Sequence, residues 1–362
     1  MRTPITVASL AVTLTLFSAA VAQQRYDVQP ELTGFLEEQA DEGYSGGAVA
    51  TDDSCDGPTC DLGNCRPCAS WCFTAGALIM ERSSPDDTPL VTDGYPNQTG
   101  ETVLLNADEF DFDFRGGFEL SAIRRNVRCT CWDLEARYFR IDGWQAIRRP
   151  VYSPTGAIVQ YLRPIGETAY PGRISGSYDS HLDSLELNLR RPFCCGRYTF
   201  LAGFRFAELD ERGQTITHDI GPRQDLITHD AGAINDLYGF QLGADARLFE
   251  CGCFSADTLL RAGAYGNRIA TSTFVTQTTG PNYVALGEES HTSFLGELGL
   301  TGTCQINDCM ALTAGYRLMW LEGVAVASDQ LAVSDPIGGT TTVDTGGSPF
   351  YHGAVISLEY CR

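Results

Sequence analysis

Residues 237–267 read LYGFQLGADARL FECGCF SADTLLRAGAYGN, and this stretch decides the fold class. In its first part, the apolar residues Tyr238 and Phe240 occupy even-numbered positions, while the polar residues Gln241 and Arg247 occupy odd-numbered ones. Successive side chains of a β-strand point to opposite faces, so this alternation predicts a strand with one apolar and one polar face. A short turn then leads into a second strand.

The same alternation recurs along the chain, as in LELNLR (185–190), where leucines alternate with polar residues. A further segment, AIVQYLRPI (157–165), is a candidate extra strand without an evident partner. The expected strands span residues 71–82, 110–124, 130–142, 181–191, 197–209, 236–249, 255–269, 292–303, 309–326 and 350–360.

Long and short connections alternate strictly between these strands. The short ones span residues 125–129, 192–196, 250–254 and 304–308, and the long ones span 83–109, 143–180, 210–235, 270–291 and 327–349. In an up-and-down sheet, every long loop then lies at one end. Bacterial outer-membrane barrels have this asymmetry. The prediction is an all-β, antiparallel up-and-down transmembrane β-barrel of about 10 strands, with short periplasmic turns and long extracellular loops.

The N-terminal residues have the order of a secretory signal. An arginine near the start is followed by an apolar stretch and by Ala20-Val21-Ala22. This order predicts a cleaved signal peptide over residues 1–22 and export to the outer membrane. Residues 23–70 form a cysteine-rich periplasmic segment, partly disordered, and residues 71–362 form the barrel.

The 14 cysteines favour disulfide bonds, because an exported chain meets an oxidising compartment. Pairs stand at or beside the short turns, so disulfides are expected to staple the periplasmic rim. A zinc site around the C-x-x-C motif near residues 65–68 is the competing interpretation, disfavoured because no histidine is near. The disulfide candidates are Cys55, Cys60, Cys65, Cys68, Cys72, Cys129, Cys131, Cys194, Cys195, Cys251, Cys253, Cys304, Cys309 and Cys361.

The polar strand faces carry acidic and basic residues together, which suits a lumen where unlike charges neutralise one another. A solvated sheet face would show similar charges, but the opposite faces are continuously apolar, as between residues 310 and 320. Aromatic residues near strand ends, namely Trp71, Trp132, Tyr138, Trp320 and Tyr360, are candidates for interfacial girdles. The candidate pore-lining residues are Asp133, Glu135, Arg137, Glu186, Asn188, Arg190, Arg205, Asp245, Arg247, Arg261, Glu297, Arg317 and Glu359.

Several runs in a fixed order carry a family resemblance: LNADEFDFDFRGGFEL, LELNLRR, LAGFRFAELDE, LYGFQLGADARL, AGAYGN, FLGELGLTG, AGYRLMWLEGVAVA and HGAVISLEY. Together, from about Trp71 to Tyr360, they resemble the planctomycete-type outer-membrane β-barrel porin family, the seventh so named. The resemblance implies an outer-membrane barrel of the kind called a porin.

The expected function is that of a narrow passive pore for ions or small solutes, in contact with outer-membrane lipid. A structural or anchoring role, with envelope partners at the cysteine-rich rim, is the alternative. A formal charge of −21 disfavours nucleic acid. No catalytic residue, metal or cofactor is expected. A rim hydrolase like the ten-stranded outer-membrane proteases is a weaker alternative, resting on the histidines His181, His218, His229, His291 and His352.

Overall fold

The computed structural model describes residues 70–93, 102–127, 130–153, 158–160, 172–193, 196–219 and 226–362. Of the twelve strands in its main sheet, ten close into a ring, and β14 and β13 extend from β11. The ring strands are β1 (Ser70–Arg82), β4 (Arg115–Arg125), β5 (Asp133–Ser153), β7 (Gly172–Phe193), β8 (Tyr198–Asp219), β9 (Leu226–Cys251), β10 (Phe254–Gln277), β11 (Tyr283–Asn307), β12 (Met310–Glu322) and β15 (Phe350–Cys361).

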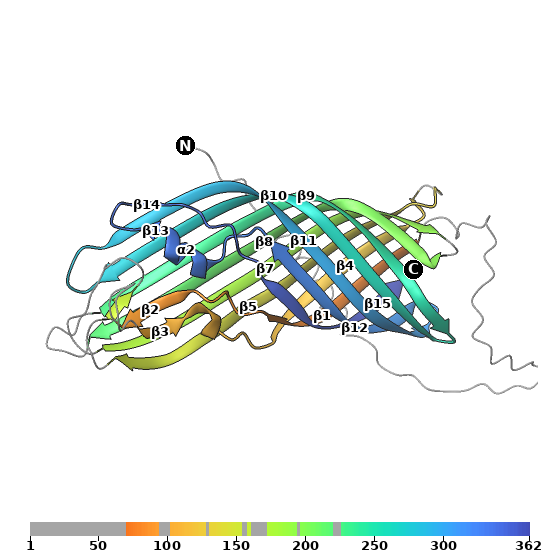
Figure 1. The fold of residues 1–362 in the computed structure, drawn as a ribbon. Coiled ribbons are helices and arrows are strands. Elements are labelled where there is room, and N and C mark those ends of the chain that lie inside the picture. Colours follow the sequence, from red (N-terminus) through yellow and green to blue (C-terminus); the bar gives the residue numbers. More distant parts are fainter. Residues whose placement is uncertain are drawn as a thin grey trace, which may run out of the picture. The chain divides into compact units, whose positions relative to one another are not determined.

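Each ring strand pairs antiparallel with the ring strand before and after it in the chain, which is up-and-down topology. The ring closes where β1 pairs with β15, in a register that places Cys72 opposite Cys361. These two cysteines form a disulfide. Figure 1 shows the long strands running side by side at a common tilt. The predicted transmembrane barrel with short periplasmic turns and long extracellular loops is confirmed.

Several strands extend further toward the extracellular end than the alternation predicts. Strand β7 begins at Gly172, β9 at Leu226 and β11 at Tyr283, so the expected long joins 143–180, 210–235 and 270–291 were too long. The apolar/polar pattern changes there, which hid the strands. The predicted strand 110–124 was wrong at its start, because β4 begins only at Arg115.

Polarity inverts along each long strand, as β7 illustrates. Between Leu185 and Phe193, the outward residues other than Arg191 are apolar and lie at the lipid-facing surface, such as Leu187, which is 53% exposed. This span fits the ~9–11 residues of a tilted transmembrane strand. Between Gly172 and Asp183, the outward residues are mostly polar or charged. We call these two parts of the barrel the membrane half and the outer half.

Two segments between ring strands fold into the outer half, and together we call them the plug. One, residues 83–114, includes the described parts β2 (Pro89–Asp93), β3 (Thr102–Asn106) and the short 3-10 helix η1 (Ala107–Glu109). The other, residues 323–349, carries α2 (Ala327–Val333), β13 (Ser334–Asp335) and β14 (Thr340–Thr341). Figure 1 shows these elements gathered at the end of the barrel away from the C-terminus.

The candidate extra strand proves to be part of a small separate sheet. Its described part, β6 (Ile158–Gln160), pairs with β2, and β2 pairs with β3. It therefore adds no strand to the ring. None of the helices among the described residues is long and apolar enough to span a bilayer.

Candidate functional site

A layer of charged side chains crosses the lumen of the membrane half. Arg137 of β5 reaches Glu297 of β11 at 2.8 Å, and these strands stand five positions apart in the ring of ten, on opposite walls. Arg137 also pairs with Glu119 at 2.6 Å and with Glu186 at 3.0 Å. One guanidinium thus ties three carboxylates from three strands. We call this group the ion-pair layer.

Further arginines complete the layer from other walls. Arg317 pairs with Glu119 at 2.6 Å and with Glu297 at 3.2 Å. Arg261 pairs with Glu186 at 2.7 Å. Burial raises the cost of an unpaired charge, so each carboxylate with several guanidinium partners is stable only as part of the whole network.

Amide side chains fill the gaps between these charges. The Gln241 side chain donates to Glu186 and to the side-chain oxygen of Asn188, both at 2.8 Å. The Asn188 side chain in turn donates to Glu135 at 2.9 Å. Asn188 stands over Gly203, where a Cβ atom would lie 2.1 Å from the amide oxygen. Glycine at that position therefore gives the amide its place in the layer.

An aromatic ring packs against the side of the ion-pair layer that faces the outer half. The Phe139 ring is fully buried and lies 5.5 Å from the guanidinium carbons of both Arg137 and Arg205. Arg205 is itself fully buried and pairs with Glu297 at 3.2 Å. Cation–π contact of this kind joins the charged layer to the apolar interior above it.

The interior of the outer half is an apolar core built against the plug. Phe110 and Leu105 of the first plug segment are 1% exposed. Both side chains pack over Gly176 of β7, where an added Cβ would lie 2.7 Å from the Phe110 ring and 3.0 Å from Leu105. The wall therefore has a seat shaped for the plug, and burial of this apolar area holds the plug in place.

A buried ion pair reinforces the same region. Arg82 of β1 pairs with Glu211 of β8 at 2.6 Å, both side chains being at most 1% exposed. The Tyr178 hydroxyl donates to Glu211 at 2.6 Å, and the Ala327 amide donates to the Tyr178 hydroxyl at 3.1 Å. The start of α2 is thus tied to the barrel wall through this cluster.

The second plug segment is also anchored through its backbone. Asn235 of β9 donates to the Ala325 carbonyl and accepts from the Ala325 amide, both at 2.8 Å. Ser293 donates to the Gly323 carbonyl at 2.6 Å. Gly323 has φ +75°, a left-handed conformation that suits glycine at the point where the chain turns into the lumen.

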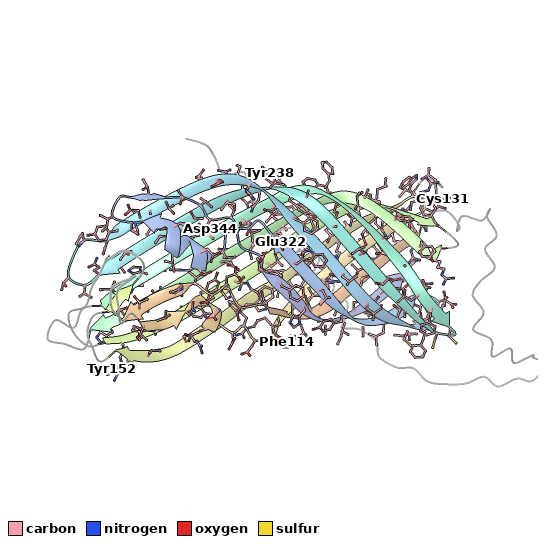
Figure 2. The ribbon with its side chains drawn as sticks, in the orientation of Figure 1. Phe114, Cys131, Tyr152, Tyr238, Glu322 and Asp344 are labelled. Atoms are coloured by element: carbon pink, nitrogen blue, oxygen red, sulfur yellow. A yellow bond between two sulfur atoms is a disulfide. The ribbon has the colours of Figure 1, made fainter. Side chains whose placement is uncertain are left out.

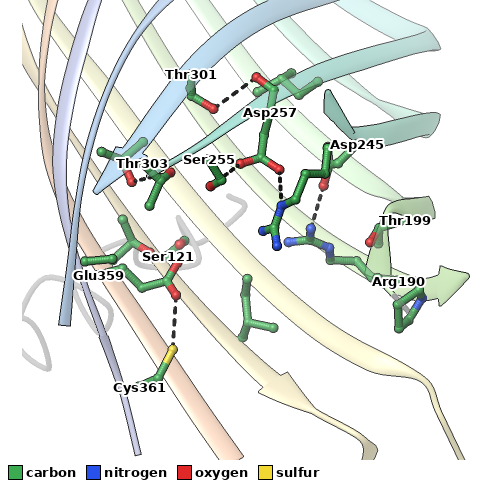
Figure 3. A pocket seen from close by; sticks show the side chains of 18 of the residues that line it. Ser121, Arg190, Thr199, Asp245, Ser255, Asp257, Thr301, Thr303, Glu359 and Cys361 are labelled. Atoms are coloured by element: carbon green, nitrogen blue, oxygen red, sulfur yellow. Dashed lines mark hydrogen bonds and ion pairs between the residues drawn. The ribbon is translucent and has the colours of Figure 1, made fainter. Parts of the chain in front are cut away.

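The periplasmic side of the ion-pair layer opens into a cavity of about 1100 Å³, which we call the vestibule. Its lining mixes charged and polar residues with apolar ones such as Ile123 and Leu259. Arg190 pairs with Asp245, as Figure 3 shows. Arg247 pairs with Asp257 at 3.0 Å. Both arginines therefore have carboxylate partners within the lining.

All thirteen residues predicted to line a pore face the barrel interior. Four of them, Glu186, Asn188, Arg205 and Glu297, are fully buried in the ion-pair layer. The other nine line the vestibule: Asp133, Glu135, Arg137, Arg190, Asp245, Arg247, Arg261, Arg317 and Glu359. That they border a conducting path stays a prediction.

Sequence reasoning missed several interior residues. Glu119 and Gln241 lie on the polar faces of their strands, so the alternation itself could have identified them. The Arg82–Glu211 pair had no such signal, because its strands invert polarity at that height. Nor did the sequence indicate that the two plug segments enter the lumen.

The described cysteines at the short turns gather at one rim. Figure 2 shows Cys131 at the end of the barrel opposite Tyr152. Cys131 and Cys251 are each disulfide-bonded, and Cys72 is bonded to Cys361. Three other candidates, Cys253, Cys304 and Cys309, carry free thiols, and their pairing stays a prediction. The candidates Cys55, Cys60, Cys65, Cys68, Cys129, Cys194 and Cys195 lie outside the described residues, as do the predicted signal peptide and nearly all of the cysteine-rich segment.

The histidines occupy separate environments. His181 accepts a hydrogen bond from the Gly143 amide at 3.1 Å, and His352 hydrogen-bonds the Tyr316 hydroxyl at 2.7 Å. His229 points inward and is buried, whereas His218 and His291 are exposed. Among the described residues, they form no common site with a carboxylate.

Solved structures that resemble this chain are outer-membrane proteins. The outer membrane protease OmpT from Escherichia coli has TM-score 0.44 at 7% identity, covering 85% of this chain and 100% of its own. A Pseudomonas aeruginosa FadL homologue has TM-score 0.23 at 8% identity, covering 82% of this chain and 90% of its own. The anion-selective porin from Comamonas acidovorans has TM-score 0.18 at 9% identity, with coverages of 81% and 99%.

No curated protein matches the sequence. A family model does match, over residues 71–337, which is most of the chain and most of the barrel. Its description is "Putative beta barrel porin-7 (BBP7)". The protein therefore belongs to this family of outer-membrane β-barrels.

Proposed function

We propose that this barrel is closed at rest and serves the outer membrane as a structural protein rather than as an open passive pore. The observation that carries the proposal is the contact between Arg137 and Glu297, which joins opposite walls of the ring. Side chains meeting across the lumen leave no water-filled path at that height among the described residues.

Opening a path would require two separate disruptions. An ion crossing the membrane half must part buried ion pairs, and breaking one such pair costs about 3–5 kcal/mol. The same ion must then pass the apolar core of the outer half, where desolvation is unfavourable. These two barriers lie in series, so relieving one leaves the other.

A passive pore is the second candidate. It is favoured by the family description and by the vestibule, whose volume of about 1100 Å³ is large enough to hold several hydrated ions. In that reading, the ion-pair layer and the plug are a resting state that some signal opens. An enzymatic role has less support, because the described histidines and carboxylates are dispersed.

Planar-bilayer recording of the refolded, oxidised protein separates our proposal from a pore that conducts without a signal, and the deletion strain described below separates it from a pore that a signal opens. We expect no conductance steps, with a known porin in the same membrane as the positive control. Regular steps from the unmodified protein would favour the pore and overturn our proposal.

A deletion strain gives an independent readout. Loss of a structural barrel is expected to weaken the outer membrane and to increase entry of a hydrophobic dye. Loss of a pore is instead expected to slow uptake of small polar solutes while dye entry stays unchanged.

A further inference from the structure

Two Arg-Arg dipeptides stand where ring strands approach the periplasmic rim. They are Arg124-Arg125 near the end of β4 and Arg190-Arg191 near the end of β7. Because successive residues of a strand face opposite sides, each dipeptide sends one arginine inward and one outward.

The two inward arginines have carboxylate partners. Arg125 pairs with Glu359 at 3.4 Å, and Arg190 pairs with Glu135 at 2.8 Å. Their positive charges are therefore neutralised by carboxylates inside the barrel.

The outward arginines contact aromatic rings instead. The guanidinium carbon of Arg124 lies 5.0 Å from the centre of the Trp71 ring, and that of Arg191 lies 5.1 Å from the Trp132 ring. Within the part of the chain that the structure describes, neither arginine has a carboxylate at ion-pair distance. Each guanidinium is held by a ring face, with its N–H donors left for another acceptor.

The strand register arranges these four residues as two Trp/Arg pairs on neighbouring strands. Trp71 of β1 stands opposite Arg124 of β4. Asp133 stands opposite Arg190, so the next residues along this ladder, Trp132 and Arg191, are neighbours on the outer face. The order across β1, β4, β5 and β7 is Trp, Arg, Trp, Arg. Arg124 itself stands opposite Leu134, so the Trp132 and Arg191 pair is displaced by two residues along the strands. The two arginines are therefore two strands and two residues apart, which corresponds to about 12 Å.

These two pairs lie on the lipid-facing side at the periplasmic edge of the apolar belt. Tryptophan favours that depth of a membrane, where the ring meets the acyl chains and its N–H meets the headgroups. An arginine at the same depth faces the phosphates of the periplasmic leaflet, and its planar fork suits a phosphate with two parallel hydrogen bonds.

We infer that Trp71, Arg124, Trp132 and Arg191 form a binding site for the phosphate of an anionic phospholipid in the periplasmic leaflet. The tryptophans hold the guanidinium planes before the lipid arrives, so little side-chain entropy is lost on binding. Lipid bound there contacts β1, β4, β5 and β7 together.

The test uses the full-length refolded protein, titrated with phosphatidylglycerol or with phosphatidylcholine and examined by native mass spectrometry. We expect phosphatidylglycerol adducts to dominate. In the double variant Arg124→Gln/Arg191→Gln, its affinity should fall by about tenfold or more, because charge-assisted hydrogen bonds are lost. The matched control Arg268→Gln, an outward arginine of the outer half, should bind like the unmodified protein.

Two further arms keep the outcome decisive. The double variant Arg124→Lys/Arg191→Lys retains charge and should fold even if the glutamine variant does not; we expect it to lose several-fold in affinity, since the planar fork is gone. Excess inorganic phosphate should not displace the lipid. Unchanged phosphatidylglycerol binding in a folded variant of either kind would overturn the proposal, and full displacement by phosphate would reassign the site to the free anion.

Discussion

The membrane half and the outer half of this barrel are built on the same strands, yet their insides and outsides are exchanged. In the membrane half, leucines such as Leu187 face outward and Glu186 lies in the lumen. In the outer half of the same strand, His181 and Asp183 are on the outer face and Leu182 is buried inside. The solvent around each half explains the difference: lipid surrounds one and water the other.

The two interiors close the lumen by different forces. The ion-pair layer depends on complete pairing of buried charge, whereas the plug depends on apolar area buried against the wall. A substitution in the ion-pair layer should therefore act through unpaired charge, whereas a substitution in the plug should act through lost apolar contact.

The largest effect is expected from Glu297→Gln. Glu297 is fully buried and pairs with Arg137, Arg205 and Arg317. Removing its charge leaves guanidinium groups uncompensated, which should lower the free energy of unfolding by about 3–5 kcal/mol in reversible urea titrations in lipid.

Glu288→Gln, on the same strand, is the control. Glu288 is 75% exposed in the outer half, and its loose pair with Arg268 spans 3.8 Å. We expect a change of at most about 0.5 kcal/mol. Equal losses of unfolding free energy in the two variants would show that the ion-pair layer contributes no more to stability than an exposed ion pair does.

Phe110→Ala tests the outer half. The alanine leaves a cavity between the plug and β7, so the plug should lose about 3 kcal/mol of local stability. Protease cleavage within residues 83–114 reports this loss. Phe114→Ala is the control, because Phe114 is 51% exposed and should tolerate the change. If both variants resisted the protease equally, the plug would not depend on its apolar seat.

Leu187→Arg tests where the membrane lies. An arginine on the lipid face of the membrane half should cost about 2 kcal/mol of folding free energy in lipid. Ser177→Arg, an outward position ten residues along β7 in the outer half, should cost almost nothing because water surrounds it. A comparable cost at residue 177 would place the outer half inside the bilayer.

The smallest effect concerns pH and Asp329 of α2. Burial in the plug raises the pKa of Asp329 from 3.8 to about 6, and the carboxylates of Asp344 and Asp86 add to the shift. The folded plug thus favours the protonated acid, so its stabilising contribution is full below the unfolded value and is lost as pH rises through about 6.

Hydrogen exchange over residues 327–349 measures this dependence. Exchange should speed up by a few-fold between about pH 5 and about pH 8, beyond the intrinsic rate change. In Asp329→Asn the excess should vanish. An excess that persists in that variant would assign the pH response to another group.

The contrast between the two halves also explains which parts of the fold could be predicted from the sequence. Alternation found every ring strand, because leucines and aromatics facing lipid give a clear period of two, and it placed Arg137 and Glu297 in the interior. It could not place Phe110, whose motif FDFDF has the period of a strand but packs as part of the plug. Nor could it give the outer ends of β7 and β9, since the sequence does not state where lipid gives way to water.

The most direct test of the account is a spin-label accessibility scan along β7 in lipid vesicles, with single cysteine substitutions in a background whose native free thiols are replaced. Labels at outward positions 185, 187 and 189 should be relaxed by oxygen, which concentrates in the bilayer. Labels at outward positions 177, 179 and 181 should be relaxed by a water-soluble nickel complex. Oxygen-dominated relaxation at all six positions would contradict the account, because the outer half would then face lipid.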